Sequence, residues 1–99
     1  MLIEKHILVI DDDERLSFLL KSYLLEKGYL VDSAVNTKIA RAKMLCILYD
    51  LIILDVMLPD ESGLKFATQL RKNNPIPILM LSAMGEVEDR IKGLRTGAD

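Results

Sequence analysis

The sequence is short of several features that define whole classes of protein. Its one cysteine, Cys46, excludes an internal disulfide and fits a reducing compartment, which predicts a cytoplasmic location. No apolar run reaches the roughly 18 residues of a membrane span, and the apolar stretch at the N-terminus is too soon interrupted by acids to be a signal peptide. A formal net charge of -2 lacks the basic excess with which nucleic-acid-binding domains offset phosphates.

What is present is a regular alternation of strand and helix patterns over 99 residues, a length that predicts one domain, residues 1–99. Four short apolar runs predict strands: 6–10, 29–34, 51–54 and 78–81. Apolar spacing and capping residues predict four helices: the stripe from 16 to 24, then 37–48, 63–72 and 86–96. Strands separated by helices pair in parallel through right-handed crossovers. The sequence therefore predicts an α/β fold with an open, doubly wound parallel sheet.

Polar side chains stand where three of these predicted strands end. Asp11 and Asp12 follow the first strand, Asp55 the third and Ser82 the fourth. If the first and third strands are neighbours, the three aspartates converge at the carboxyl edge of the sheet, where ligands bind in such folds. Oxygen ligands without Cys or His nearby favour Mg²⁺. An incomplete protein shell would leave a position for a phosphoryl oxygen, and one carboxylate could then act as the nucleophile.

A simpler interpretation is that acids after strands cap helices, and we interpret Asp13 and Asp60 in that way. It is weaker for Asp55, which is flanked by apolar chain, because a desolvated acid needs a partner. Ser82, taken alone, would be an ordinary loop hydroxyl or the cap of the following helix.

Four stretches in this order resemble one known family: HILVIDDD, LIILDVMLPDESG, PILMLSA and DRIKGLRTGAD. They are similar to the CheY-like receiver domain of two-component response regulators. The resemblance is greatest to the OmpR/PhoB subfamily, whose members usually carry a winged-helix DNA-binding domain after the receiver. It covers essentially all 99 residues and implies a flavodoxin-like fold.

The resemblance also implies roles for individual residues. Asp55 would be the phosphoacceptor that receives a phosphoryl group from a sensor histidine kinase. Asp11, Asp12 and Asp55 would hold Mg²⁺, with the backbone carbonyl of Met57 as a further ligand. Family members change conformation on phosphorylation to control an output, here transcription, and are not conventional enzymes.

The same resemblance implies roles for three further residues, and this chain differs from the family pattern in one respect. Ser82 matches the switch hydroxyl, whereas Pro59 and Gly63 match the loop that shapes the rim of the site. The family continues with a fifth strand, which ends in a phosphate-binding lysine, and a fifth helix. The resemblance therefore implies a receiver cut short before that strand, with no such lysine in this chain. We expect the exposed edge to be covered by homodimer formation, and DNA to be contacted only through a domain absent here.

Three other functions remain open on the sequence. A Mg²⁺-dependent aspartyl phosphatase of the haloacid dehalogenase type also uses an aspartate at a strand end, but Met57 stands where those enzymes need a second aspartate. A nucleotide-binding module would need a glycine-rich loop after the first strand, where three aspartates stand instead. A degenerate, phosphorylation-independent interaction domain would fit the missing lysine but not the intact acids.

Overall fold

The computed structural model describes residues 5–81 of the chain. The elements in order are β1 (His6–Ile10), α1 (Glu14–Glu26), β2 (Leu30–Ala34), α2 (Thr37–Cys46), β3 (Leu51–Asp55), α3 (Gly63–Arg71) and β4 (Ile78–Leu81). The predicted alternation of strands and helices is therefore confirmed as far as β4. Ser82 and the fourth predicted helix lie outside the described residues.

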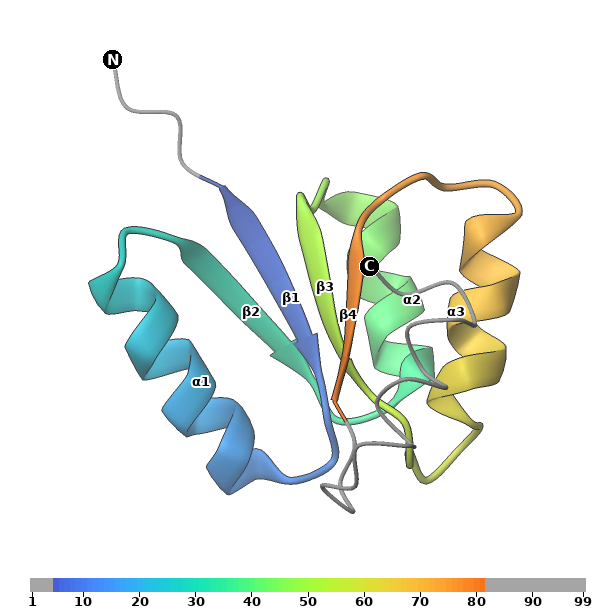
Figure 1. Cartoon of the computed structure of the whole chain (residues 1–99), viewed down its shortest axis with the longest axis horizontal. Helices are drawn as coiled ribbons and strands as arrows, with labels where there is room; N and C mark the ends of the chain where they lie inside the picture. The colour runs from blue at the N-terminus through green and yellow to red at the C-terminus, as the bar shows by residue number, and fades with distance from the viewer. Residues whose placement is uncertain (1–4, 82–99) are drawn as a thin grey trace.

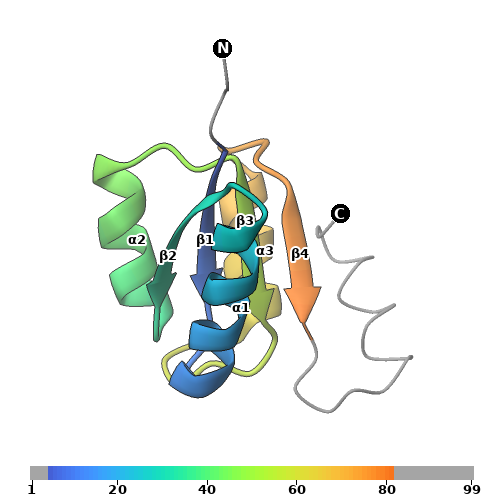
Figure 2. The same ribbon diagram turned by 90° about the vertical axis from the view of Figure 1, so that its left-hand side faces the viewer.

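All neighbouring strands are parallel, and their order across the sheet is β2-β1-β3-β4 (Figure 2). This order places β1 beside β3, so the aspartates that stand at the ends of these two strands can converge. Ile10 is in register with Leu54, so the residues that follow them leave the sheet at the same edge. The doubly wound α/β fold is confirmed.

The helices form two layers, with α1 on one face of the sheet and α2 and α3 on the other (Figure 1). Both faces of the central strands are consequently apolar. Leu8, Ile10, Ile52 and Leu54 are fully buried on one face, and Ile7, Val9 and Ile53 are buried on the other. The core on the α2–α3 side is the larger, and Phe66 of α3 is its bulkiest fully buried side chain. No helix among residues 5–81 is long and apolar enough to cross a membrane.

The apolar stripe predicted for the first helix is only partly buried. Leu20 and Leu24 of α1 pack against the sheet, but Leu16, Leu19 and Tyr23 are 38%, 56% and 57% exposed. Within the described residues α1 alone covers this face, so part of its apolar stripe is left uncovered. Leu79 of β4, which is 41% exposed, belongs to the same uncovered region.

Local signals set the ends of the helices. The Asp13 side chain accepts hydrogen bonds from the first turn of α1, which confirms its predicted role as a cap. Gly28 has a φ of +94° in the turn after α1, a backbone conformation that other residues rarely adopt. Asn36 caps α2, as predicted. However, α2 ends at Cys46, two residues before the predicted end, because Ile47 is extended and packs against the core.

Candidate metal centre

The first part of the site is the turn that follows β1. Asp11 continues the pairing of β1 with β2, since its N–H donates to the carbonyl of Ala34 at 3.0 Å. The residue is buried, with 3% of its surface exposed. The side-chain Oδ1 of Asp11 accepts the N–H of Asp13 at 2.9 Å. Asp12, between them, is exposed. One acid of this pair is thus fixed by the backbone, whereas the other stands in solvent.

The second part is the end of β3. Asp55 is the last residue of this strand and is 4% exposed. Its Oδ1 accepts the N–H of Met57 at 3.3 Å. The following loop returns beside the strand, because Gly63 donates its N–H to the carbonyl of Val56 at 2.8 Å. Met57 and Ser62 form an antiparallel bridge across the base of this loop.

Gly63 allows this close approach of loop and strand. A Cβ atom at this position would lie 2.0 Å from the backbone oxygen of Asp55 and 3.0 Å from its carbonyl carbon. Real Cβ atoms do not come that close to other atoms, so only glycine fits here. Gly63 therefore lies at the closest contact between loop and strand, and Pro59 is exposed in the same loop. That these two residues shape the rim of the site stays a prediction.

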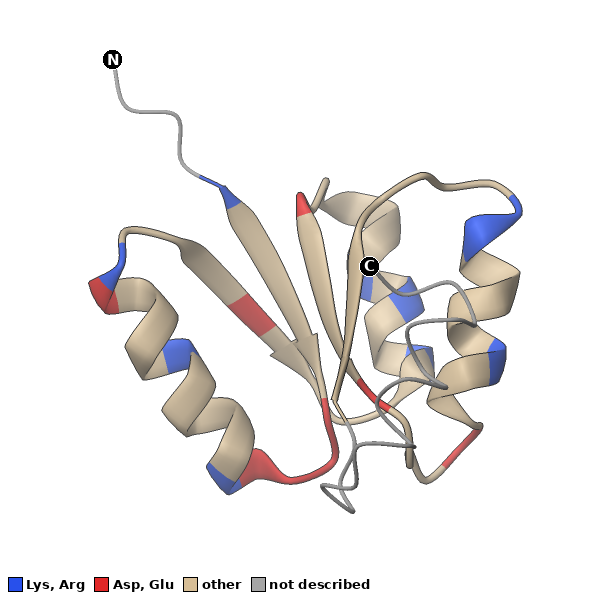
Figure 3. Cartoon of the chain, in the orientation of Figure 1, with Lys and Arg blue, Asp and Glu red and all other residues tan. Residues whose placement is uncertain are grey.

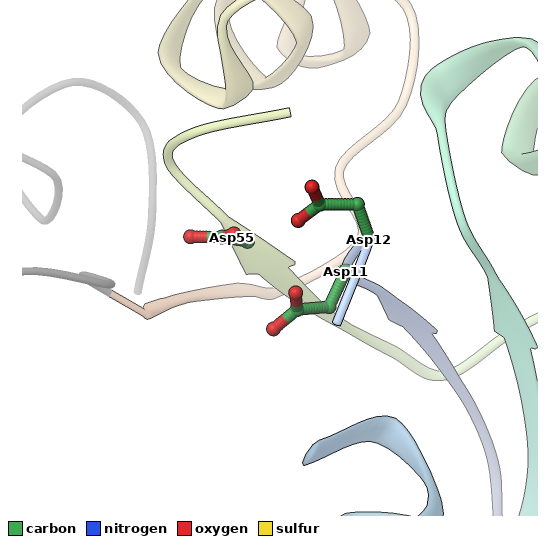
Figure 4. Close-up of side chains that lie close together, drawn as sticks. All are labelled: Asp11, Asp12 and Asp55. Carbon is green, nitrogen blue, oxygen red and sulfur yellow. The ribbon is translucent and has the colours of Figure 1, made fainter. Parts of the chain in front are cut away.

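The two parts bring three carboxylates together. One ligand oxygen from each of Asp11, Asp12 and Asp55 lies within 4.8 Å of the others, which is the one such group among the described residues. The three side chains extend to the same side of the strand ends (Figure 4). Figure 3 shows that the segments after β1 and β3 are both acidic, so negative charge gathers at this edge of the sheet.

The protonation behaviour of the cluster follows from burial and from like charge. Burial raises the pKa of Asp11 to about 6, the Asp13 N–H opposes this, and the negative charges of Asp55 and Asp12 add to the rise. Burial also raises the pKa of Asp55, and the charge of Asp12 acts in the same direction, against the hydrogen bond from Met57. The ionised cluster is therefore electrostatically unfavourable without a positive charge near it.

The donor set fits a hard divalent cation. Three carboxylates can offer oxygen atoms, and two of them are oriented by hydrogen bonds from backbone N–H groups. Mg²⁺ takes one or two carboxylates and keeps several waters, which suits a site where Asp12 is exposed to solvent. A cation here would offset both the burial and the like charge that raise the pKa values of Asp11 and Asp55.

Most of the predicted site residues are accordingly close together. Asp11, Asp12 and Asp55 form the cluster, and Met57 follows Asp55 by two residues with its side chain 59% exposed. Ser82 lies outside the described residues. The predicted role of Asp60 was right in kind, because it caps a helix, but the helix is α2 rather than the one that follows it. The partner of Asp60 is Thr37, a buried residue 23 positions away that the sequence did not single out.

The fold and the acidic cluster together define a doubly wound α/β domain with a candidate cation site at the carboxyl edge of its sheet. The chain belongs to the family of response regulator receiver domains, whose model matches residues 7–99. This family assignment confirms the one that the sequence motifs suggested.

Individual relatives agree with this assignment. The chain is 44% identical to Protein PetR of Rhodobacter capsulatus over 94 residues, which are 95% of this chain and 40% of that protein. It is 43% identical to the transcriptional regulatory protein ResD of Bacillus subtilis, over 97% of this chain and 40% of ResD. The chain thus spans about 40% of the length of these relatives. The solved response regulator TrrA of Thermotoga maritima, in complex with Mg²⁺ and BeF, is 38% identical with a TM-score of 0.82, over 96% of this chain and 82% of that one.

Proposed function

We propose that this domain accepts a phosphoryl group on Asp55, with Mg²⁺ bound, from the phosphohistidine of a sensor kinase. The observation that carries the proposal is the convergence of Asp11, Asp12 and Asp55 at the carboxyl ends of β1 and β3 in a chain of the receiver family. A single acid at a strand end would be an ordinary cap. Three that share one site, two of them buried, form a site that needs a cation.

In the proposed reaction a carboxylate oxygen of Asp55 attacks the phosphorus atom of the donor. A P–O bond forms, the P–N bond to the donor imidazole breaks, and its electron pair stays on the nitrogen, which gives an acyl phosphate on Asp55. Asp55 is suited to this role because the Met57 N–H fixes its carboxylate and burial excludes competing water. The residue is itself modified, so we expect the domain to be a phosphoacceptor with at most weak self-catalysis rather than an enzyme.

Asp11 and Asp12 would hold the cation, with Asp55 and the Met57 carbonyl as further ligands. When bound, Mg²⁺ supplies positive charge that offsets the negative charge of an incoming phosphoryl group. The backbone hydrogen bond from Asp13 fixes the orientation of the Asp11 carboxylate. Support for Mg²⁺ comes from this donor set and from TrrA, a relative solved with Mg²⁺ and BeF.

The output of the switch lies beyond this domain. ResD and SrrA of Staphylococcus aureus, two relatives that the chain matches over about 40% of their length, are transcriptional regulatory proteins. We therefore propose that phosphorylation of this domain controls transcription through a DNA-binding part of a longer protein of the OmpR/PhoB type. Three expectations from the sequence stay predictions: that the protein is cytoplasmic, that it forms a homodimer, and that Ser82 is the switch hydroxyl.

The decisive experiment is to incubate the protein with acetyl phosphate and to record its intact mass with and without Mg²⁺. We expect a phosphoryl mass gain that needs Mg²⁺ and is lost in Asp55→Asn. Asp13→Asn is the matched control, because Asp13 is a neighbouring acid that caps α1 and stands outside the cluster. The proposal would be wrong if Asp55→Asn gained the same mass, or if the mass gain were unchanged when a chelator removes Mg²⁺.

A further inference from the structure

The loop between β3 and α3 is fastened to the first turn of α2 by two acidic side chains. Asp60 Oδ2 accepts the backbone N–H groups of Thr37 and Lys38, each at 3.1 Å, and lies 2.8 Å from the Thr37 hydroxyl. Glu61 lies 2.7 Å from the same hydroxyl and forms an ion pair with Arg41. We call the side chains of Thr37, Arg41, Asp60 and Glu61 the loop latch.

Thr37 is the centre of the latch. It is 1% exposed, although it begins a surface helix. Its hydroxyl has one hydrogen, so it donates to one of the two carboxylates at a time, and it accepts from Nη1 of Arg41 at 3.2 Å. Replacing this hydroxyl by a methyl group would remove the one donor that the two carboxylates share, and would leave Asp60 with the backbone N–H groups of Thr37 and Lys38 and Glu61 with Arg41.

The charges of the latch are balanced within it. Glu61 and Asp60 are both negative, and they face the guanidinium of Arg41 and the positive N-terminal end of α2. The hydrogen bond from Arg41 holds the pKa of Glu61 below its usual value, against burial. Partial desolvation alone would raise the pKa of Asp60, but the bonds from Thr37 and Lys38 hold it low. These two acids are thus satisfied by the chain itself, unlike Asp11 and Asp55.

Arg41 is held in place by α3 as well. Its Nη2 donates to Oε1 of Gln69 at 3.0 Å, and its guanidinium lies 4.8 Å from the centre of the Phe66 ring. The latch therefore connects α2, the loop and α3 into one unit. A planar guanidinium makes all these contacts at once, which a lysine at the same position would not do.

The position of the latch relative to the acidic cluster gives it a consequence. The base of the loop is fixed beside Asp55 by the Val56–Gly63 hydrogen bond, and Met57 bridges to Ser62. The latch fixes the other end of the loop to α2, which follows β2. Since β1 lies between β2 and β3 in the sheet, the latch joins the segments that follow the two strands on either side of β1, which leads into Asp11 and Asp12.

We propose that Thr37 is a positioning residue for the metal centre. Through Asp60 and Glu61 it holds the loop that carries Met57, and so keeps the Met57 backbone and the Asp55 carboxylate in the geometry that binds Mg²⁺. The inference deepens the proposed function and rests on it. Thr37 touches neither the cation nor the phosphoryl group, so its effect passes through the loop.

The test is Thr37→Val, which removes the hydroxyl and keeps the branched shape, measured by calorimetric titration with Mg²⁺. Loss of a side chain that orients a metal site typically weakens metal binding by about 10-fold or more, and we expect a loss of about 10-fold here. Thr37→Ser should restore the affinity because it keeps the hydroxyl. Hydrogen exchange of the Met57 amide should quicken in Thr37→Val and return to normal in Thr37→Ser.

The matched control is Thr68→Val, which removes a threonine hydroxyl that donates to Leu64 O within α3 and is exposed. It should leave the Mg²⁺ affinity unchanged. Glu61→Gln, which keeps the shape of Glu61 and removes its charge, should give a smaller loss in the same direction as Thr37→Val, and it serves if that variant fails to fold.

The outcomes separate the two proposals. If the unaltered protein binds Mg²⁺ and gains mass on Asp55, but Thr37→Val and Glu61→Gln bind Mg²⁺ as well as it does, the positioning role is wrong and the proposed function stands. If Thr37→Ser fails to restore affinity, the hydroxyl is not the cause and the role is again wrong. If the unaltered protein neither binds Mg²⁺ nor gains mass, both proposals fall.

Discussion

The contact between Gly63 and the backbone of Asp55 gives a sharp prediction about how loop geometry controls the site. In Gly63→Ala the new Cβ would lie 2.0 Å from the Asp55 carbonyl oxygen, against a closest real approach of 3.0 Å, so loop and strand must separate by about 1 Å. The obstacle is backbone rather than a flexible side chain, so it has no rotamer through which to yield. We expect this overpacking to cost about 1–3 kcal/mol of unfolding free energy.

The effect on phosphoryl transfer should be larger than the effect on stability. A displacement of about 1 Å at a reacting group can cost about 100-fold in rate, because the attacking and accepting atoms are no longer aligned. We therefore expect Gly63→Ala to gain mass from acetyl phosphate about 100-fold more slowly than the unaltered protein. The assay is the initial rate of Mg²⁺-dependent mass gain on Asp55, with urea unfolding measured in parallel.

Gly28→Ala provides the matched control. Gly28 has a φ of +94°, and no other atom lies within 4 Å of the place that an added methyl group would take, so alanine there is strained but not crowded. It should lose about 1–2 kcal/mol for backbone strain alone. It lies at the end of α1 and should accept the phosphoryl group at the normal rate. Equal rates in Gly63→Ala and Gly28→Ala, at similar stability, would refute the reasoning that loop position limits transfer.

Three further outcomes are expected. Because burial raises the native pKa of Asp11 to about 6, above that of the unfolded chain, the native state binds this proton more tightly. The unfolding free energy of the metal-free protein should therefore fall by about 1–2 kcal/mol, after allowance for solvent screening, as pH rises from about 4 to 6. Urea unfolding of Asp11→Asn should show a smaller decline, because the pKa of Asp55, which burial also raises, still contributes to it. Phe66→Ala should lower the unfolding free energy by about 3–5 kcal/mol in the same assay, since it leaves a cavity in the core on the α2–α3 side. Tyr49→Phe should cost about 1 kcal/mol, because it removes the 2.8 Å hydrogen bond from Tyr49 to Asp32.

Much of this fold was predictable because its signals are local and repeated. Four apolar runs separated by helical patterns leave parallel pairing as the natural arrangement, and Asp13 and Asn36 mark helix starts by residue type alone. The site followed from the same logic, since parallel strands gather their carboxyl ends at one edge. The only further condition was that β1 and β3 be neighbours, and they are.

The parts that escaped prediction depend on contacts between distant segments. Nothing in the residues around Thr37 indicates that it is buried, because its partner Asp60 comes 23 residues later and from a loop. The same separation explains why the sequence predicts that Asp60 caps a helix but does not indicate that this helix is α2. The exposure of Leu19 and Tyr23 was equally hidden, since an apolar stripe predicts a covered face but not how much of it the neighbouring elements cover.

Four acids of the described part of the chain fall into two pairs that differ in their surroundings. Asp60 and Glu61 are surrounded by donors, namely backbone N–H groups, a hydroxyl and a guanidinium, and their pKa values are lowered. Asp11 and Asp55 are buried near other acids, and their pKa values are raised. An acid of the first group is already stabilised by its own chain, whereas an ionised acid of the second group costs folding energy unless a positive charge lies beside it. A chain that keeps Asp11 and Asp55 buried together accepts that cost at one edge of its sheet, and binding of a divalent cation is the simplest way in which the cost is offset.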